Sequence, residues 1–214
     1  MGYPNGNFVP RGNITRAETA ALLVRTMTTH FGVNAPRTSV GDSASMFSDV
    51  TSNMWFYDYV AIAYSYGLIQ GFPDGRFMPN SPITREQFAA MLARTTTVYS
   101  GGALPFTDAK SVSGWAFDYV YTTYVSGLMV GDAVGTFRPR QPITRAEAAA
   151  AMSRILERGD TTSRSIANVQ NLTIFPDVAD RRSWYFYYVV EATNSHWFIK
   201  DGYEEIWVDV KLYP

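Results

Sequence analysis

Three arginines stand at the same place in a repeated motif, each directly after an isoleucine and a threonine. The three Ile-Thr-Arg motifs are 69 and then 60 residues apart and end at Arg16, Arg85 and Arg145. If each threonine caps a helix, each arginine takes the first helical position, where a cation opposes the helix dipole at a cost of roughly 0.3–1 kcal/mol. A guanidinium beside the free N–H groups of a helix start suits a carboxylate or a phosphate ligand.

The residues leave two interpretations of these arginines open. In the first, the arginines and the helix N–H groups converge on an anionic ligand. In the second, each arginine pairs with the aspartate of a repeated Phe-x-Asp motif and is structural. Those aspartates are Asp49, Asp108 and Asp177. Their recurrence predicts a structural role for the aspartates themselves, because one catalytic pair of acids would not need three copies.

Tryptophans and glycines recur with the same spacing as the charged residues. The tryptophans that follow the Phe-x-Asp motifs are Trp55, Trp115 and Trp184. Each could stack on a sugar face or fill the space between helices. The turns before two of the arginines contain Gly71, Gly75, Gly131 and Gly135. These glycines could let a ligand approach the backbone, but ordinary turn geometry explains them as well and is the favoured interpretation.

The elements that must position these residues are helices organised in repeats. The motifs occur in the order half repeat, whole repeat, whole repeat, half repeat. The corresponding ranges are 1–31, 47–98, 106–158 and 175–214. The two halves complement each other, so we predict one domain over residues 1–214 with three quasi-equivalent repeats, one of them split between the chain ends. Such repeats gain stability by packing together.

The spacing of apolar residues after each tryptophan predicts an amphipathic helix, and Gly67 and Gly127 stand where such a helix would end. A second helix in each repeat begins with a capping box. The capping pairs are Thr15 with Glu18, Thr84 with Gln87, and Thr144 with Glu147. These second helices are rich in alanine, which permits close approach. We therefore predict a mainly α fold with a pseudo-threefold arrangement around a central helix bundle.

Three further arginines align between the repeats, in the middle of the second helices. They are Arg25, Arg94 and Arg154. We expect these side chains to be solvated or to pair between helices rather than to contact a ligand.

Composition excludes several classes of protein. The 214 residues carry a net charge of −1 without a basic block, which argues against nucleic-acid binding. Cysteine is absent, which excludes disulfides, thiol catalysis and cysteine metal sites. The sequence contains no run of 18 apolar residues, the length that a membrane-spanning helix needs. Neither His30 nor His196 has the sequence spacing of a metal site, so we expect no metal, no cofactor and no catalysis. Residues 1–13 contain no apolar signal segment, so an export signal is expected outside this chain.

The combination of Phe-x-Asp, Trp, Gly-Phe-Pro-Asp-Gly-x-Phe-x-Pro and Ile-Thr-Arg resembles the S-layer homology (SLH) family. The resemblance implies a monomeric, three-pronged pseudo-trimer of SLH repeats in a secreted protein at the bacterial cell wall. It also implies binding to secondary cell-wall polysaccharide attached to peptidoglycan, often through pyruvylated sugars, in grooves between repeats. The contacts that it implies are Arg16, Arg85, Arg145, Trp55, Trp115 and Trp184.

The chain departs from the family pattern in several places, and the middle motif has Thr84-Arg85-Glu86-Gln87 in place of Thr-Arg-Ala-Glu. The third turn has Asp132-Ala133-Val134 where the second has Phe72-Pro73-Asp74. In the last half repeat, His196 and Lys200 stand where the other repeats have glycines.

Three functions remain as hypotheses. The first is a non-catalytic, glycan-binding anchor. The second is a module for protein–protein interaction or for assembly of a surface lattice. The third is a hydrolase acting on wall glycan, which requires one acid that is unique to one repeat.

Overall fold

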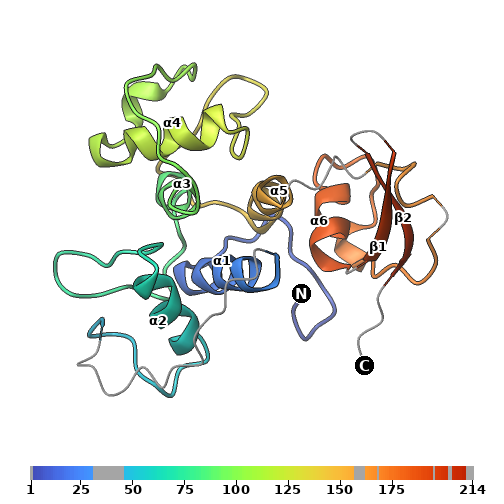
Figure 1. The fold of residues 1–214 in the computed structure, drawn as a ribbon, viewed down its shortest axis with the longest axis horizontal. Coiled ribbons are helices and arrows are strands. Elements are labelled where there is room, and N and C mark those ends of the chain that lie inside the picture. The colour runs from blue at the N-terminus through green and yellow to red at the C-terminus, as the bar shows by residue number, and fades with distance from the viewer. Residues whose placement is uncertain are drawn as a thin grey trace. The chain divides into compact units, whose positions relative to one another are not determined.

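The computed structural model describes residues 2–30, 46–156, 162–167, 169–194, 196–201 and 204–210, and it is mainly helical, as expected (Figure 1). The α-helices are α1 (Arg16–His30), α2 (Tyr57–Ser65), α3 (Arg85–Ala93), α4 (Phe117–Val125), α5 (Arg145–Ile155) and α6 (Phe186–Thr193). Short 3-10 turns span Ala109–Ser111, Gly114–Ala116 and Pro176–Val178. Two strands, β1 (His196–Asp201) and β2 (Glu204–Val210), follow α6.

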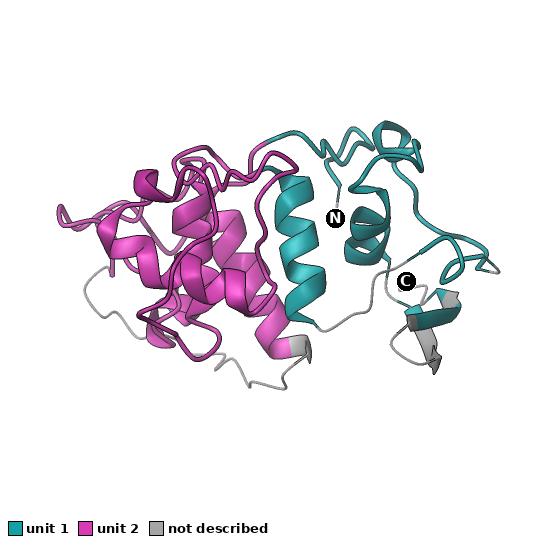
Figure 2. Ribbon diagram, turned by 90° about the horizontal axis from the view of Figure 1, so that it is seen from above, with its two compact units in different colours: residues 1–12, 144–214 teal, residues 13–143 magenta. Residues whose placement is uncertain are grey.

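The chain divides into two compact units, which Figure 2 distinguishes by colour. Compact unit 2 is residues 13–143, in which α1 packs against α2 and α3 against α4. Compact unit 1 joins residues 1–12 to residues 144–214, and there α5 packs against α6. Both chain ends therefore belong to one compact unit. The single domain and the boundaries of its repeats stay predictions.

The predicted capping boxes are present at the starts of α1, α3 and α5. At α3 the Thr84 hydroxyl accepts the N–H of Gln87, and the Gln87 side chain accepts the N–H of Thr84, both at 3.3 Å. The same reciprocal bonds join Thr15 to Glu18 and Thr144 to Glu147. Each box satisfies backbone donors that have no partner inside the helix.

The predicted glycine ends of α2 and α4 are also confirmed. Gly67 and Gly127 have φ angles of +69° and +68°, in the left-handed region that glycine tolerates. After Gly67, the N–H of Leu68 returns to the carbonyl of Ala63 at 2.9 Å, which closes the last turn of α2. After α6 the chain instead becomes extended at Asn194 and enters β1.

The isoleucines of the three Ile-Thr-Arg motifs are hydrogen-bonded to one another through their backbones. Ile14 donates to the carbonyl of Ile143 at 3.2 Å, Ile143 to that of Ile83 at 3.0 Å, and Ile83 to that of Ile14 at 3.1 Å. These bonds form a closed ring, and all three side chains are buried. The ring brings together segments 60 and 69 residues apart, which a three-repeat arrangement requires. The pseudo-threefold geometry itself stays a prediction.

The aspartate of each Phe-x-Asp motif holds a distant turn. Asp49 accepts the N–H of Phe77 at 2.8 Å with one carboxylate oxygen and that of Met78 at 2.7 Å with the other. Met78 has a φ of +56°, a conformation that costs a non-glycine residue about 1–3 kcal/mol. The equivalent sets are Asp108 with Phe137 and Arg138, and Asp177 with Phe8 and Val9. The carboxylate offsets the backbone strain, and Asp177 ties the C-terminal part of the chain to its N-terminus.

The C-terminal hairpin was not predicted from the sequence. Strands β1 and β2 are antiparallel, from His196 opposite Val210 to Asp201 opposite Glu204, with a register shift between Trp197 and Phe198. Trp207 of β2 joins a buried core within compact unit 1. That core also contains Phe8, Ala149, Ile166, Val178, Phe186, Val189 and Val190. The hairpin thus helps to enclose the core formed by the two chain ends.

We predict that Asp49→Asn lowers the free energy of unfolding by about 1.5–3 kcal/mol. An amide oxygen can replace only one of the two charged acceptors, and the amide NH₂ would face the second N–H group. Urea denaturation followed by circular dichroism measures the change.

The matched control is Asp74→Asn, since Asp74 lies in the same turn but is exposed and pairs with Arg76 at the surface. Surface pairs contribute little to stability, so this variant should unfold like the wild type. Equal effects of the two substitutions would contradict the role assigned to Asp49.

Candidate functional site

Arg16 lies inside the protein rather than on its surface. Only 5% of its surface is exposed. Its Nε donates to the carbonyl of Phe77 at 2.7 Å, and one terminal nitrogen donates to the carbonyl of Gln70 at 2.9 Å. The guanidinium lies over the rings of Phe72 and Phe77, 4.8 and 4.6 Å from their centroids. Burial lowers the pKa of Arg16 to about 10 while the Asp49 carboxylate opposes the change, so the group stays charged at neutral pH.

The other two predicted arginines adopt the same arrangement. Arg85 is buried, and its Nε donates to the carbonyl of Phe137 at 2.6 Å. Arg145 is half-buried, and its Nε donates to the carbonyl of Phe8 at 2.8 Å, with the Tyr3 ring centroid 4.6 Å away. All three guanidinium groups therefore contact both the backbone and an aromatic ring of a turn far away in the sequence.

The arginine and the aspartate of the two motifs meet at the same phenylalanine. Asp49 accepts the N–H of Phe77, and Arg16 donates to the C=O of Phe77. The same relation joins Asp108, Phe137 and Arg85, and it joins Asp177, Phe8 and Arg145. The second interpretation of the sequence predicted a direct pair between each arginine and the aspartate of a Phe-x-Asp motif. The observed bonds instead connect the arginine and the aspartate through the backbone of the phenylalanine. Each arginine thus has a structural role, and a ligand role for it stays a prediction.

The proposed use of free helix N–H groups is wrong, because the protein itself occupies them. At α1 the N–H of Arg16 donates to the carbonyl of Ser81 at 3.1 Å. The N–H of Ala17 donates to Pro79 at 2.9 Å, and the Thr15 hydroxyl accepts the next one. The first two N–H groups of α3 donate to Gln141 and Pro139, and those of α5 to Gly12 and Pro10. An anion at these sites would have to bind through side chains.

The three predicted tryptophans lie at the surface. Trp55, Trp115 and Trp184 are 62%, 56% and 60% exposed. Each precedes a helix of the α2, α4 and α6 set instead of packing inside it. The alternative that they fill the space between helices is therefore wrong, and their large apolar faces remain accessible to a ligand.

Trp55 and Trp184 each pack against a tyrosine that a second arginine contacts, and an equivalent Arg–Tyr bond forms at Tyr119, four residues after Trp115. We call each of these three sets a Trp–Tyr–Arg cluster. Trp55 packs edge-on against Tyr59 at 6.4 Å, and Arg25 of α1 donates to the Tyr59 hydroxyl at 3.0–3.1 Å. The equivalent bonds join Arg94 to Tyr119 and Arg154 to Tyr188. The expected pairing between helices is confirmed. Sequence reasoning overlooked that this pairing joins an arginine to the tyrosine four residues after each tryptophan, although the spacing of 69 and 60 residues was the available signal.

Backbone conformation or lack of space explains why glycine stands at each of the four predicted turn positions. Gly75 and Gly135 have φ angles of +81° and +78°. A Cβ on Gly71 would lie 2.4 Å from the Phe47 ring and 2.8 Å from the Arg76 carbonyl. A Cβ on Gly131 would meet Phe106 in the same way. These contacts support the turn interpretation, and any backbone contact of the glycines to a ligand stays a prediction.

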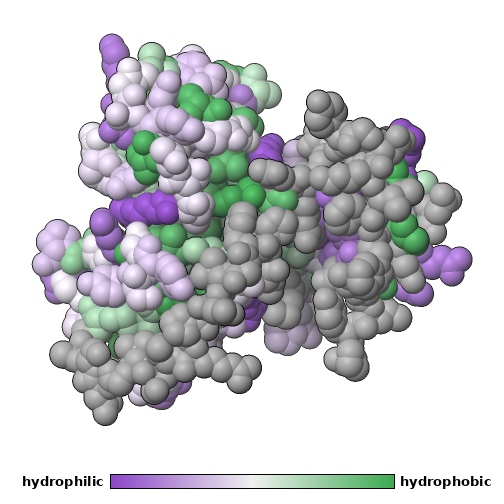
Figure 3. All heavy atoms as spheres, in the orientation of Figure 1, coloured by the Kyte–Doolittle hydropathy of each residue, from purple (hydrophilic) through white to green (hydrophobic). Residues whose placement is uncertain are grey.

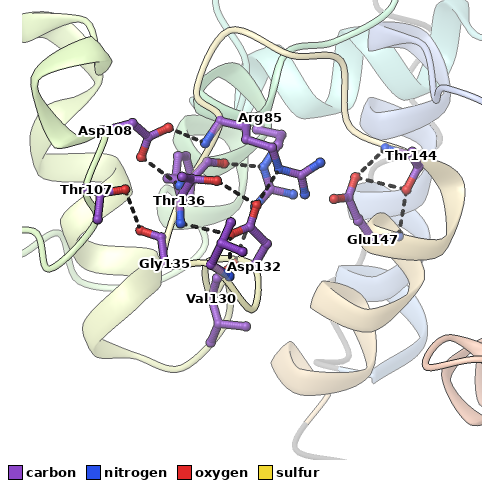
Figure 4. A network of polar contacts seen from close by, with 12 residues as sticks. Arg85, Thr107, Asp108, Val130, Asp132, Gly135, Thr136, Thr144 and Glu147 are labelled. Atoms are coloured by element: carbon purple, nitrogen blue, oxygen red, sulfur yellow. Dashed lines mark hydrogen bonds and ion pairs between the residues drawn. The ribbon is translucent and has the colours of Figure 1, made fainter.

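The altered third turn is closed by a different residue. Asp132 accepts hydrogen bonds from the backbone and the hydroxyl of Thr136, at 2.9 and 2.6 Å (Figure 4). These bonds lower the pKa of Asp132, which is ionised at neutral pH. Asp132 takes the position of Phe72 and lies two residues beyond Val130, whose carbonyl accepts a bond from Arg85. The Arg85 site therefore has an anionic residue where the Arg16 site has an aromatic ring.

Sequence spacing also missed a buried cluster in compact unit 1. Glu191, His196 and Glu205 come from α6, β1 and β2, and their ligand-capable atoms lie within 4.8 Å of one another. The replacement of an aligned glycine by His196 was the available signal. The hairpin that carries Glu205 to this histidine was not foreseen.

No α-helix in the described ranges is long and apolar enough to cross a membrane.

The repeated caps, aspartate-held turns and exposed tryptophans define a helical repeat module. The S-layer homology domain matches residues 1–20, 47–89 and 105–149, and the chain belongs to that family. Resemblance to the family is thus confirmed.

Three relatives show the context of such modules. Cell surface glycoprotein 1 of Acetivibrio thermocellus is 30% identical over 217 residues, which is 97% of this chain and 9% of the relative. The cellulosome-anchoring protein of the same organism is 35% identical over 164 residues, 74% of this chain and 35% of the relative. The surface-layer 125 kDa protein of Lysinibacillus sphaericus is 30% identical over 168 residues, with coverages of 77% and 13%.

The chain spans at most 35% of the length of these three relatives. The relatives are surface, surface-layer and anchoring proteins, and the family is one of cell-surface anchoring modules. Membership confirms the predicted location at the bacterial cell surface.

We predict that Gly71→Ala destabilises the protein by about 1–3 kcal/mol, because the new methyl group overpacks the buried Phe47 ring and the Arg76 carbonyl. Thermal and urea unfolding measure the loss. Gly114→Ala is the matched control, because a Cβ at Gly114 would meet no atom within 4 Å. A Gly71→Ala variant as stable as Gly114→Ala would contradict the steric explanation.

Proposed function

We propose that this chain is a non-catalytic anchor that binds an acidic secondary polysaccharide of the bacterial cell wall, with a pyruvylated sugar as the recognised group. Three exposed tryptophans at equivalent positions are the observation that carries the proposal. Exposed indole rings cost solvation energy and stabilise no core here, whereas aromatic faces suit the apolar faces of sugars.

Charge explains the preference for an acidic sugar. At Trp55 and Trp184, the tyrosine that packs against the exposed indole is also bonded to an arginine, Arg25 or Arg154. The neutral carbonyls of Phe77 and Gln70 orient Arg16, and its charge persists at neutral pH. A ketal-linked pyruvate would supply the carboxylate for such cations, and guanidinium groups bind carboxylates strongly.

The protein-interaction alternative finds less support in the surface. In the view of Figure 3, the face over α3 and α4 is mostly neutral to hydrophilic, with hydrophobic residues in small separate groups. Protein-docking sites more often present one contiguous apolar patch. The repeated acids Asp49 and Asp108 hold turns, which gives the hydrolase alternative no support from those residues.

The proposal predicts that replacing Trp55, Trp115 and Trp184 together by alanine weakens binding to purified cell-wall sacculi. Loss of a stacked aromatic contact costs about 0.5–1.5 kcal/mol per site, or roughly 2–10-fold in affinity. Because the three side chains are exposed, the variant should keep the circular dichroism spectrum and melting temperature of the wild type. Co-sedimentation with sacculi measures the binding.

The control is Tyr99→Ala, which removes another exposed aromatic residue outside the three clusters and should bind like the wild type. Sacculi stripped of secondary polysaccharide should retain neither the wild type nor the control. Undiminished binding to stripped sacculi, or by the triple variant, would refute the glycan proposal and favour a protein partner.

The proposal also ranks the arginine sites. We predict that Arg16→Ala weakens binding to pyruvylated polysaccharide more than Arg85→Ala does. The turn that Arg85 contacts carries the ionised Asp132 where the turn at Arg16 carries Phe72, and this negative charge disfavours an anionic ligand. The difference should vanish on polysaccharide from which the ketal has been removed by mild acid.

Titration calorimetry at a temperature where both variants are folded, as verified by circular dichroism, gives the two affinities. Arg16→Lys is the conservative control: it keeps the charge but loses the fork of N–H donors that holds the Phe77 and Gln70 carbonyls. A larger loss for Arg85→Ala than for Arg16→Ala would contradict this ranking.

A further inference from the structure

Three ionisable side chains are buried together between α6 and the C-terminal hairpin. Glu191, His196 and Glu205 are 3%, 7% and 6% exposed. The Nε2 atom of His196 lies 3.9 Å from Glu191 Oε1 and 3.7 Å from Glu205 Oε2. Burial of charged groups is costly unless they are paired or bind a metal, so a cation bound here would stabilise the cluster.

The orientation of the imidazole shows where that charge belongs. His196 Nδ1 lies 3.1 Å from the carbonyl oxygen of Asn194, which can only accept a hydrogen bond. Nδ1 therefore carries a proton, and in the neutral ring Nε2 directs its lone pair toward the two carboxylates. Three possible ligand atoms then lie within 4.8 Å of one another, an arrangement that suits a cation between them.

Glu205 provides an independent indication of a missing ligand. Its Oε2 is fully buried and has no hydrogen-bond partner among the described residues. It is also the oxygen nearer to His196 Nε2. A buried carboxylate oxygen in this situation is a ready metal ligand.

The geometry and the ligand types suit zinc. Tetrahedral zinc with bonds of about 2.0–2.1 Å places neighbouring ligand atoms about 3.3 Å apart, so the observed 3.7 and 3.9 Å need only a small contraction. An imidazole nitrogen favours zinc and similar transition metals over calcium or magnesium, which prefer oxygen. The bond from Nδ1 to Asn194 is the outer-shell contact that commonly fixes a metal-binding histidine.

We propose that Glu191, His196 and Glu205 form a binding site for a divalent transition-metal ion, with zinc as the best fit. The ion joins α6 to both strands of the hairpin and so stabilises compact unit 1. The Trp207 ring stacks on the imidazole at 3.5 Å and 8°, which forms an apolar wall and limits ring rotation. This inference replaces the sequence-based expectation that the chain has no metal site, and it is independent of glycan binding.

The test uses the full chain, freed of metal with a chelator and then titrated with zinc by calorimetry. We expect one zinc ion per chain and a melting temperature that rises with zinc, falls again with EDTA and does not respond to calcium. Cobalt should give the visible absorption of a tetrahedral site. Absence of zinc binding to the folded wild type would overturn the proposal, because the cluster would then be compensated by a proton on Nε2.

The variant Glu205→Gln keeps the side-chain volume and should lower zinc affinity more than about 100-fold, since even outer-shell changes cost about 10–100-fold. Glu86→Gln is the matched control: Glu86 is an equally buried glutamate in compact unit 2, where it accepts bonds from Ser113, and its loss should leave zinc affinity unchanged. Unchanged affinity in Glu205→Gln, or equal losses in both variants, would overturn the assignment. The wild-type titration decides the question even if Glu205→Gln fails to fold.

Discussion

The structure depends on one repeated interaction, the two-pronged bond from an aspartate to consecutive N–H groups of a distant turn. Asp49 holds Phe77 and Met78 in this way, and Met78 occupies a left-handed conformation that it would not adopt alone. The bond fixes the direction in which the turn leaves toward the next helix. Without it, neither the buried phenylalanine nor the arginine that contacts its carbonyl would be positioned.

The role of the repeated arginine motif follows from this constraint. Once the Phe77 N–H is held by Asp49, its carbonyl points to Arg16, and the ring of Phe77 lies under the guanidinium. Burial of the cation is tolerated because it has backbone acceptors and aromatic faces. The helix-start cost of a cation is thus explained by scaffolding alone. The position of the arginine therefore does not by itself indicate a ligand, whereas the exposure of Trp55 has no role in the scaffold.

Local features could be predicted from the sequence, and long-range ones could not. Capping at Thr84 and the end of α2 at Gly67 depend on residues within a few positions, and both were correct. The N–H of Arg16 donates to the carbonyl of Ser81, 65 residues away, and a local sequence pattern cannot predict such a distant partner. The sequence left the exposure of Trp55 open for a related reason: periodicity places a residue on a helix face, but Trp55 lies before α2 begins.

The C-terminal part of the chain diverges from the pattern of motifs but keeps the aspartate-held turn. Asp177 still holds Phe8 and Val9, so the interaction on which the fold depends is intact. Beyond α6, however, the glycine end is gone and His196 begins a strand. Residues freed from the repeat pattern can acquire a different chemistry, and here they assemble a buried histidine with the carboxylate of Glu205. Because Trp207 of this part of the chain packs in one core with Phe8, a metal ion there would also stabilise the packing of the C-terminal residues against the N-terminal ones.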